Sequence, residues 1–203
     1  KGLEEIANIS SVFLRMFEDQ LGVYPFKELD IVEIPGYSPY AIYGISPASL
    51  VMLGDAGTRT VDSASKNIGT RVLPGLIAHE LAHQWFGHKI WQASELDNWI
   101  TESFSEYQSG IGAQYAKLDD QVARGQHVKG WRAMLDDWRS FGKWCDKDTS
   151  IEAANRLRDA NAGAIRRCLL YNRGPLVLHM FRNWMSDKAY FAVIQQLIKN
   201  NEY

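Results

Sequence analysis

The first quarter of the chain carries one helical and two strand-like patterns of hydrophobic residues. In the segment 2–20, apolar residues recur at three- and four-residue steps with charged residues between them, and Gly22 ends the pattern. This predicts an amphipathic helix. The segment 29–34 alternates between apolar and polar residues, and a second short apolar run covers 49–53. Both are typical of strands, whereas the small polar residues of 55–70 predict a loop.

The remaining three quarters show helical periodicity alone. After Pro74, apolar residues again recur at three- and four-residue steps until Gly87, so we expect a buried helix over 74–86. Further helices are predicted over 98–116, 119–141, 151–158, 163–183 and 187–200. Since strands are few and early and helices many and late, the pattern predicts an α+β, mostly helical fold with a small N-terminal sheet and a helical C-terminal lobe.

Length and composition are those of one globular domain. The chain has 203 residues, of which 46% are hydrophobic and 23% charged, a balance that excludes a disordered or collagen-like chain. We expect a single domain over 1–203, divided into an α+β lobe over about 1–145 and a helical lobe over about 146–203, with the loop 143–150 as boundary. Because the first residue is Lys rather than Met, we interpret the chain as a fragment of a longer one, and its sequence indicates no cellular compartment.

Charge and hydropathy exclude two classes of partner. Twenty-two Lys and Arg stand against 24 Asp and Glu, the net charge is −2, and no basic stripe occurs, so we expect no nucleic acid partner. No apolar run approaches the roughly 18 residues of a membrane span, so we expect none in this fragment. The two cysteines, Cys145 and Cys168, are too few for a disulfide framework or a Cys-based metal site, and we interpret them as free thiols.

The predicted buried helix contains the sequence His79-Glu-Leu-Ala-His83, which matches His-Glu-x-x-His. The two histidines are one helical turn apart, so both imidazoles leave the same face and can bind one zinc ion at about 2.0–2.1 Å. Glu80 lies roughly 100° around the helix, where it can accept a proton from a water that the cation has made acidic. Burying three ionisable groups among apolar neighbours is costly unless a cation pairs them, so we interpret the motif as a zinc site.

A catalytic zinc needs a third protein ligand beside an open position for water. The acidic residues that follow the motif are Glu95, Asp97, Glu102 and Glu106. Spacing alone does not separate Glu102 from Glu106, because the two are one turn apart on the same face of the predicted helix 98–116.

The segments 79–88 and 97–107 resemble the gluzincin metallopeptidases of the aminopeptidase N family. In that family eighteen residues separate the second motif histidine from the ligand glutamate, and the same spacing from His83 leads to Glu102 within Trp-Ile-Thr-Glu-Ser-Phe. The resemblance implies a thermolysin-like catalytic domain in which His79, His83 and Glu102 hold one Zn²⁺ per chain. It also implies a peptide substrate and, in the parent chain, flanking domains that help to close the substrate cavity.

Near the other end, Tyr171-Asn-Arg-Gly174 resembles the family's Tyr-x-Lys-Gly motif. The tyrosine of that motif donates a hydrogen bond to the oxyanion that forms as water attacks. Taken alone, Tyr171 is better explained as an interior aromatic with a satisfied hydroxyl. Together with the zinc motif, the resemblance implies that Glu80 and Tyr171 are the catalytic residues.

One segment departs from the family's pattern. The family's exopeptidases carry Gly-x-Met-Glu-Asn before the zinc motif, and its glutamate binds the free amino terminus of the substrate. The corresponding stretch 43–50 contains no carboxylate, with Ile45 and Ser46 where Glu and Asn would be, so the substrate-binding residues stay unassigned. The resemblance implies zinc-dependent hydrolysis of peptide bonds, aminopeptidase-type in the parent protein. Two alternatives stay open: a zinc endopeptidase or other hydrolase with altered amino-terminus recognition, and a non-catalytic peptidase-fold interaction module.

Four further polar residues have ordinary structural interpretations. Asp97 either orients a zinc-binding histidine or caps the helix that begins at residue 98. We expect His88 to cap the last carbonyls of the preceding helix or to pair with an acid. His127 is interpreted as a surface residue and His179 as a hydrogen-bonded core histidine.

Overall fold

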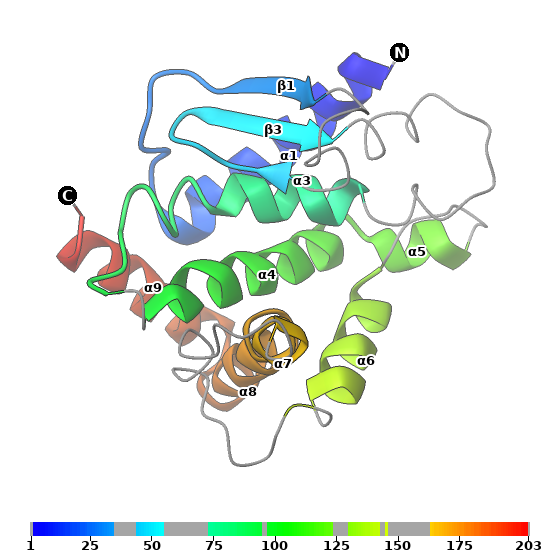
Figure 1. Ribbon diagram of the computed structural model, residues 1–203, viewed down its shortest axis with the longest axis vertical. Helices are drawn as coiled ribbons and strands as arrows, with labels where there is room; N and C mark the ends of the chain where they lie inside the picture. The colour runs from blue at the N-terminus through cyan, green and yellow to red at the C-terminus, as the bar shows by residue number, and fades with distance from the viewer. Residues whose placement is uncertain are drawn as a thin grey trace.

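The computed structural model describes residues 2–34, 44–54, 73–94, 97–123, 130–142, 145 and 163–202. Helices dominate this part of the chain, and one small sheet lies at the top of the view in Figure 1. The predicted fold class, mostly helical α+β with a small N-terminal sheet, is confirmed to this extent. The strands are β1 (Asp30–Ile34), β2 (Gly44–Ile45) and β3 (Leu50–Gly54). The helices are α1 (Gly2–Leu21), α3 (Leu73–Ala82), α4 (Asn98–Tyr115), α5 (Leu118–Ala123), α6 (Trp131–Gly142), α7 (Gly163–Cys168), α8 (Gly174–Met185) and α9 (Asp187–Asn200), and the π-helical segment η5 (Leu169–Arg173) joins α7 to α8.

The sheet has the strand order β1-β3-β2. β1 and β3 are parallel, and their paired residues run from Asp30 opposite Leu50 to Ile34 opposite Gly54. These two strands coincide with the predicted ones. β2 is antiparallel to β3 and is not among the predicted strands, because a two-residue strand leaves no alternating pattern to detect. It contacts α3, so it matters for the site described below.

The elements stack in layers (Figure 1). The sheet and α1 lie above α3, α4 lies below α3, and α8 lies below α4. The core between these layers is strongly aromatic: Phe17 and Trp85 meet edge to face at 5.9 Å, and both are fully buried. Tyr107 and Trp138 fill the core on the other side of α4. α3 and α4 are therefore packed on both sides, which holds the residues that they carry in fixed positions.

The helix that carries the His-Glu-x-x-His motif ends earlier than predicted. α3 stops at Ala82, four residues before the expected end at residue 86. The chain then tightens into turns, since the amides of Gln84 and Trp85 donate to carbonyls three residues back, as is common at a helix C-terminus. Gly87 follows with a φ of +134°, a conformation that glycine adopts readily.

The single helix predicted over 119–141 is wrong. The described residues form two helices, α5 and α6, that point in different directions (Figure 1). The Arg132 amide donates to Asp119 Oδ1 at 3.2 Å, whereas thirteen residues of one α-helix would span roughly 20 Å. Asp119 therefore satisfies a free amide in the first turn of α6, a long-range contact that periodicity does not reveal.

The predicted helices over 163–183 and 187–200 are confirmed by α7, η5, α8 and α9, although the first of them contains an unexpected π-helical turn. The predicted loop 55–70 and helix 151–158 lie outside the described residues. So does the expected lobe boundary 143–150, apart from Cys145, and the division into two lobes stays a prediction.

The interpretation of the two cysteines as free thiols is wrong. Cys145 and Cys168 form a disulfide with Cα atoms 5.8 Å apart. It joins Cys145, three residues after the end of α6, to the last residue of α7, and Cys145 belongs to a small buried cluster with Leu169 and Leu170. Two cysteines 23 residues apart give no sequence signal of their pairing, because only the fold brings their backbones within bonding distance.

Removing this disulfide is expected to lower the free energy of unfolding of the domain by about 2–4 kcal/mol, because the crosslink restricts the unfolded chain. The measurement is denaturant unfolding of the parent protein against its Cys145→Ser/Cys168→Ser variant. The variant serves as its own control, since a dithiol reductant should destabilise the wild type and leave the variant unchanged. Equal unfolding curves for both proteins would contradict the expectation.

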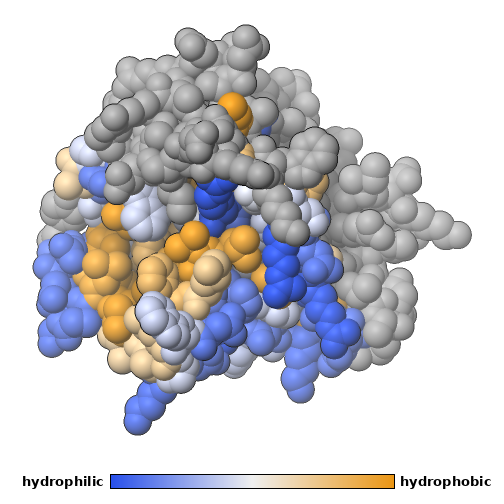
Figure 2. Space-filling view, turned by 90° about the horizontal axis from the view of Figure 1, so that it is seen from below, coloured by the Kyte–Doolittle hydropathy of each residue, from blue (hydrophilic) through white to orange (hydrophobic). Residues whose placement is uncertain are grey.

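The lower face of the molecule exposes apolar side chains. Figure 2 shows hydrophobic residues gathered beside charged ones on this face, and the exposed large apolar residues of α8 and α9 are Met180, Phe181, Trp184, Met185 and Val193. Such surfaces are typical of contacts with another domain or protein. Within the described residues, no helix has both the length and the apolar character needed to cross a membrane.

Candidate metal centre and active site

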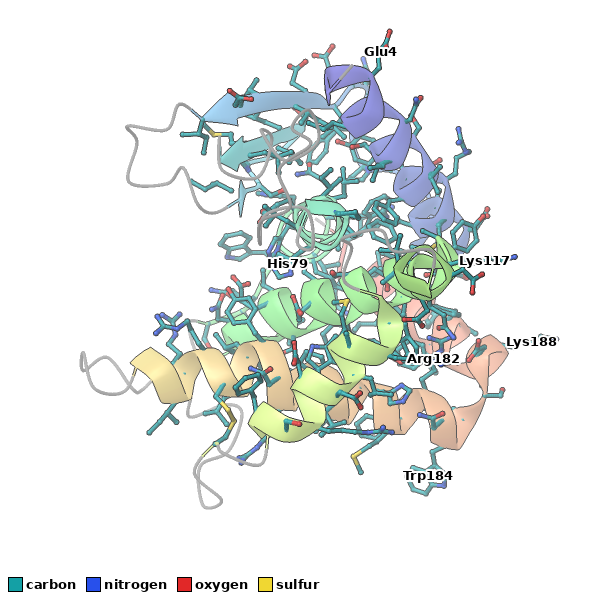
Figure 3. All side chains as sticks on the ribbon, turned by 90° about the vertical axis from the view of Figure 1, so that its right-hand side faces the viewer. Glu4, His79, Lys117, Arg182, Trp184 and Lys188 are labelled. Carbon is teal, nitrogen blue, oxygen red and sulfur yellow. A yellow bond between two sulfur atoms is a disulfide. The ribbon has the colours of Figure 1, made fainter. Side chains whose placement is uncertain are left out.

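The motif residues project from α3 toward α4. His79 and Glu80 belong to α3, and His83 occupies the turn directly after it, with its amide donating to the His79 carbonyl at 3.3 Å. The helical path therefore continues far enough to keep both imidazoles on one face. In Figure 3, His79 lies between α3 and α4, and Glu102 reaches the same space from the first turns of α4.

Three side-chain atoms are spaced as ligands of one cation. His79 Nε2 and His83 Nε2 are 3.0 Å apart, and Glu102 Oε2 lies 3.6 Å from the first and 3.7 Å from the second. A tetrahedral zinc with ligands at 2.0–2.1 Å has neighbouring ligand atoms about 3.3 Å apart. Among the described residues, this trio is the group that fits a metal ion. The donor set of two imidazoles and one carboxylate also fits zinc by its chemistry.

The other nitrogen of each histidine has its own hydrogen-bond partner. His79 Nδ1 donates to Glu106 Oε2 at 3.1 Å, and His83 Nδ1 donates to the Phe86 carbonyl at 3.1 Å, with the Ser105 hydroxyl at the same distance. These bonds orient both rings and direct the Nε2 atoms toward the cation position. They also separate the two glutamates that spacing alone could not: Glu102 faces both Nε2 atoms, whereas Glu106 holds the far side of His79.

The pKa values of the three donor groups are shifted in different directions. Burial opposes the charged form of His79, but hydrogen bonds to Glu102 and Glu106 outweigh it and raise its pKa to about 10. Burial and the neighbouring His79 charge lower the pKa of His83 to about 4. The pKa of Glu102 falls to about 2, because its hydrogen bond with His79 and the nearby imidazoles outweigh the effect of burial. The site thus balances positive charge against a carboxylate that stays ionised.

Glu80 is nearly buried beside these donors, with 5% of its surface exposed. Burial raises the pKa of its carboxyl to about 7, partly offset by His79. β2 lies directly against it: a Cβ at Gly44 would overlap the Glu80 carboxyl group, and the Ser46 hydroxyl donates to the Glu80 carbonyl at 2.6 Å. Gly44 is therefore needed for the close approach of β2 to α3. A carboxyl group with a pKa near neutrality can both accept and release a proton.

Tyr171 reaches the site from η5. Its hydroxyl donates to Glu102 Oε2 at 2.7 Å, and its ring lies 5.8 Å from that of His79. Burial, together with the nearby Glu102, raises the pKa of the phenol, which stays protonated. The Ser103 hydroxyl donates to the Leu170 carbonyl at 2.8 Å, which ties η5 to α4. π-Helical turns occur frequently at functional sites, and this one brings a hydroxyl donor to the three candidate ligands.

An open cleft of about 350 Å³ exposes these groups to solvent. Its lining combines the five residues predicted from the sequence, His79, Glu80, His83, Glu102 and Tyr171, with residues of β2 and of the chain between α3 and α4. The structure thus brings together every predicted site residue.

The other residues singled out in the sequence lie elsewhere or act differently. The Asp97 carboxylate accepts from the backbone and hydroxyl of Ser94 and makes no side-chain cap for α4, so neither proposed role for it is supported. His88 Nε2 donates to the Ser46 carbonyl at 2.6 Å rather than to a helix end. His179 is hydrogen-bonded to Tyr107 and Asn183, as expected, but it is half-buried rather than part of the core. Glu95 and His127 lie outside the described residues.

Sequence reasoning misses two supporting residues. The sequence presents Glu106 only as a rival ligand, and its position one turn after Glu102 is the available signal for a residue on the same side of the site. Ser105, which contacts His83 Nδ1, leaves no signal in a single sequence.

Comparison with known proteins places the chain in a family. The peptidase family M1 domain matches residues 6–203. Aminopeptidase 2 of Candida albicans is 25% identical over 98% of this chain and 21% of its own length, and bovine glutamyl aminopeptidase is 27% identical over 98% of this chain and 20% of its own length. The chain therefore spans about one fifth of these relatives.

Solved structures share the fold. An M1 zinc metallopeptidase from Deinococcus radiodurans matches with a TM-score of 0.65 and 23% identity, over 96% of this chain and 37% of that one. Yeast LTA4 hydrolase in complex with bestatin matches with a TM-score of 0.67 and 17% identity, over 96% of this chain and 29% of that one. Since the family's domain covers nearly all of its residues, the chain belongs to peptidase family M1.

Proposed function

We propose that this chain is the catalytic part of a zinc-dependent peptidase, of the aminopeptidase type in the parent protein. One observation carries the proposal: three donor atoms spaced for a single cation share a cleft with a buried carboxyl group and a phenol hydroxyl. Membership of peptidase family M1 supports it. The proposal also comprises a thermolysin-like arrangement, with two lobes on either side of the metal. It further comprises flanking domains in the parent chain, since the relatives are about five times longer than this chain.

His79, His83 and Glu102 are the proposed ligands of one Zn²⁺ per chain. The ligand spacing and the hydrogen-bonded outer nitrogens support this assignment. A zinc ion held there would supply a Lewis acid that makes water more acidic and polarises the peptide carbonyl.

Different residues of the chain are proposed to transfer the proton, to stabilise the oxyanion and to orient the histidine ligands. Glu80 accepts a proton from the attacking water and passes it to the leaving amine, which its position beside the candidate ligands in the cleft supports. Tyr171 donates its hydroxyl hydrogen to the oxyanion that forms on the substrate. Glu106 and the Phe86 carbonyl hold the histidine rings in orientation.

Metal analysis tests the ligand assignment. We expect about one zinc per chain in the parent protein, lost when His79, His83 or Glu102 is replaced by Ala, because two remaining ligands hold zinc poorly. Glu106→Gln is the matched control: it keeps the zinc and weakens its affinity by about 10–100-fold, as outer hydrogen-bond partners do. Full zinc content in Glu102→Ala would move the third ligand to Glu106. A wild type without stoichiometric zinc would favour the non-catalytic interaction module.

Recognition of the substrate's amino terminus is expected to be weak at the described part of the cleft. Among its described lining residues, the carboxylates are Glu80 and Glu102, and both already have proposed roles. β2 and Ser46 offer only backbone groups, an isoleucine side chain and a hydroxyl that already bonds Glu80. An ammonium group is held best by an anion.

The corresponding experiment compares a peptide with its N-acetylated form on the parent enzyme. We expect the free amine to be preferred by less than about 100-fold, which corresponds to roughly 2.7 kcal/mol. A larger preference would mean that a carboxylate outside the described lining binds the amine. Equal cleavage of both forms would favour an endopeptidase. A related M1 zinc metallopeptidase of Deinococcus radiodurans was solved with a Tyr-Ser-Ala substrate, which makes short peptides of this kind suitable probes.

A further inference from the structure

One large aromatic residue of the cleft has no part in the chemistry proposed above. Trp91 lines the same cleft as the candidate ligands, and 56% of its surface is exposed. Of the described tryptophans, Trp85 and Trp138 are buried in the core. An indole left half in water beside a reactive centre keeps a large apolar surface available for a ligand.

A series of ring contacts connects Trp91 to the core. The ring centroids of Trp85 and Tyr24 are 5.5 Å apart, those of Tyr24 and Phe26 5.7 Å, and those of Phe26 and His88 6.4 Å. His88 in turn lies 6.4 Å from Trp91, with the two rings tilted by 38°. The contacts thus run without a gap from a fully buried side chain to the cleft.

The backbone before Trp91 is also anchored. The Ile90 amide donates to the Trp85 carbonyl and the Gly87 amide to the Ile90 carbonyl. His88 Nε2 binds the Ser46 carbonyl at 2.6 Å, and Lys89 Nζ binds the Val23 carbonyl at 2.9 Å. These bonds tie the turn after α3 to the segment that follows β2 and to the chain that follows α1. The backbone that carries Trp91 is therefore held in place, so little conformational entropy is lost when a ligand binds against its indole.

The lining of the cleft is mostly polar, with two large apolar side chains. Trp91 and Ile45 of β2 are the large apolar side chains of the lining, whereas its polar part consists of the candidate ligands, Glu80, Tyr171, Ser46, His88, Gln92, Asn98 and Thr101. A cleft with both characters suits a peptide whose amide group lies at the polar part while a side chain lies on the apolar part.

We propose that Trp91, backed by the ring of His88, forms a subsite that selects peptide substrates with a large apolar or aromatic side chain next to the scissile bond. The inference rests on the proposed peptidase function and deepens it. Covering the indole with an apolar side chain removes both surfaces from water, whereas a methyl side chain covers little of it. The benefit therefore grows with the size of the substrate's side chain, and polar chains gain least.

The test measures kcat/KM of the parent enzyme on two substrate series. One varies the residue before the scissile bond among Ala, Ser, Leu and Phe, and the other varies the residue after it. We expect Trp91→Ala to lower kcat/KM about 10–100-fold for Leu or Phe in one series and less than about 3-fold for Ala and Ser. Trp91→Phe should keep most of the preference. Trp184→Ala, which removes an exposed tryptophan that projects from the far end of the molecule in Figure 3, should change nothing.

A binding measurement keeps this inference separate from the peptidase function. In the Glu80→Gln background, calorimetry with Leu- and Ala-containing tripeptides should show the same loss of affinity in Trp91→Ala, confined to the Leu peptide. If the wild type hydrolyses no peptide but this difference in affinity holds, the proposed function fails and the subsite stands. An equal loss for all side chains, or no loss for any, would overturn the subsite whatever the activity.

Discussion

Replacing Glu80 by Gln is expected to lower the hydrolysis rate by about 10²–10⁴-fold while zinc stays bound. The amide keeps the size and shape of the carboxyl group but cannot accept a proton. Glu80 is 5% exposed, lies beside the candidate ligands and has a pKa raised to about 7 by burial. In the structure its carboxyl group lies against β2 at the cleft. The other carboxylate among the described lining residues is the proposed ligand Glu102, so no second carboxylate is free to act as the base.

Three measurements on the parent protein isolate the proton-transfer role. Zinc content and melting temperature should match the wild type, because a neutral amide is easier to bury than a charge. The affinity for a peptide should change little, since binding and proton transfer are separate contributions. A Glu80→Gln variant that is folded, loaded with zinc and as fast as the wild type would remove Glu80 from the mechanism.

The candidate site was predictable because its signals are local. His79, Glu80 and His83 lie within five residues, and helical geometry alone places their side chains. The roles of Glu102 and Tyr171 could be assigned only through the resemblance to a family. Glu106, one turn after Glu102, fits the ligand position equally well by spacing, and Tyr171 alone fits an ordinary interior tyrosine. The structure brings Glu102 Oε2 to within 3.7 Å of both histidines and to 2.7 Å from the Tyr171 hydroxyl.

The features that sequence patterns miss depend on contacts between distant segments. The disulfide joins residues 23 positions apart, and the break between α5 and α6 depends on Asp119 meeting the Arg132 amide. The close approach of β2 to Glu80 requires a glycine at position 44, but glycine is common in any turn-rich stretch because of its backbone freedom alone. Each of these features is caused by a tertiary contact, so neither the periodicity nor the residue type at these positions predicts it.

The exposed tryptophan that lines the cleft could not be identified from the sequence either. Trp91 is one of seven tryptophans, and its sequence position gives no reason to separate it from those of the core. Only the exposed fraction and the ring contacts from Trp85 through His88 distinguish it. Trp91 lines the same cleft as residues 44–46, so the exposed indole and the segment that departs from the family's pattern lie at one cleft.

Removing only the hydroxyl of Tyr171 is expected to lower kcat by about 10²–10³-fold, or roughly 2.7–4 kcal/mol of transition-state stabilisation. A phenol hydroxyl bonds weakly to a neutral substrate carbonyl and strongly to the oxyanion that replaces it, so KM should change little. The ring should keep its place in Tyr171→Phe, because it packs against His79 and the Leu169–Leu170 cluster while Ser103 holds η5 to α4. Zinc should stay bound, since none of the three proposed ligands changes, but with an affinity weakened as in Glu106→Gln, because the hydroxyl also bonds Glu102 Oε2.

Tyr107→Phe is the matched control for this prediction. Its hydroxyl is hydrogen-bonded to His179 at 3.2 Å in the core below α4, away from the described lining of the cleft. Losing that bond should cost about 1 kcal/mol of stability and leave kcat nearly unchanged. If Tyr171 is merely a packed aromatic, Tyr171→Phe should behave in the same way, with a small loss of stability and an intact kcat. That result, in a folded variant with full zinc, would defeat the assignment, because the 2.7 Å bond to Glu102 would then serve only to hold the carboxylate in place.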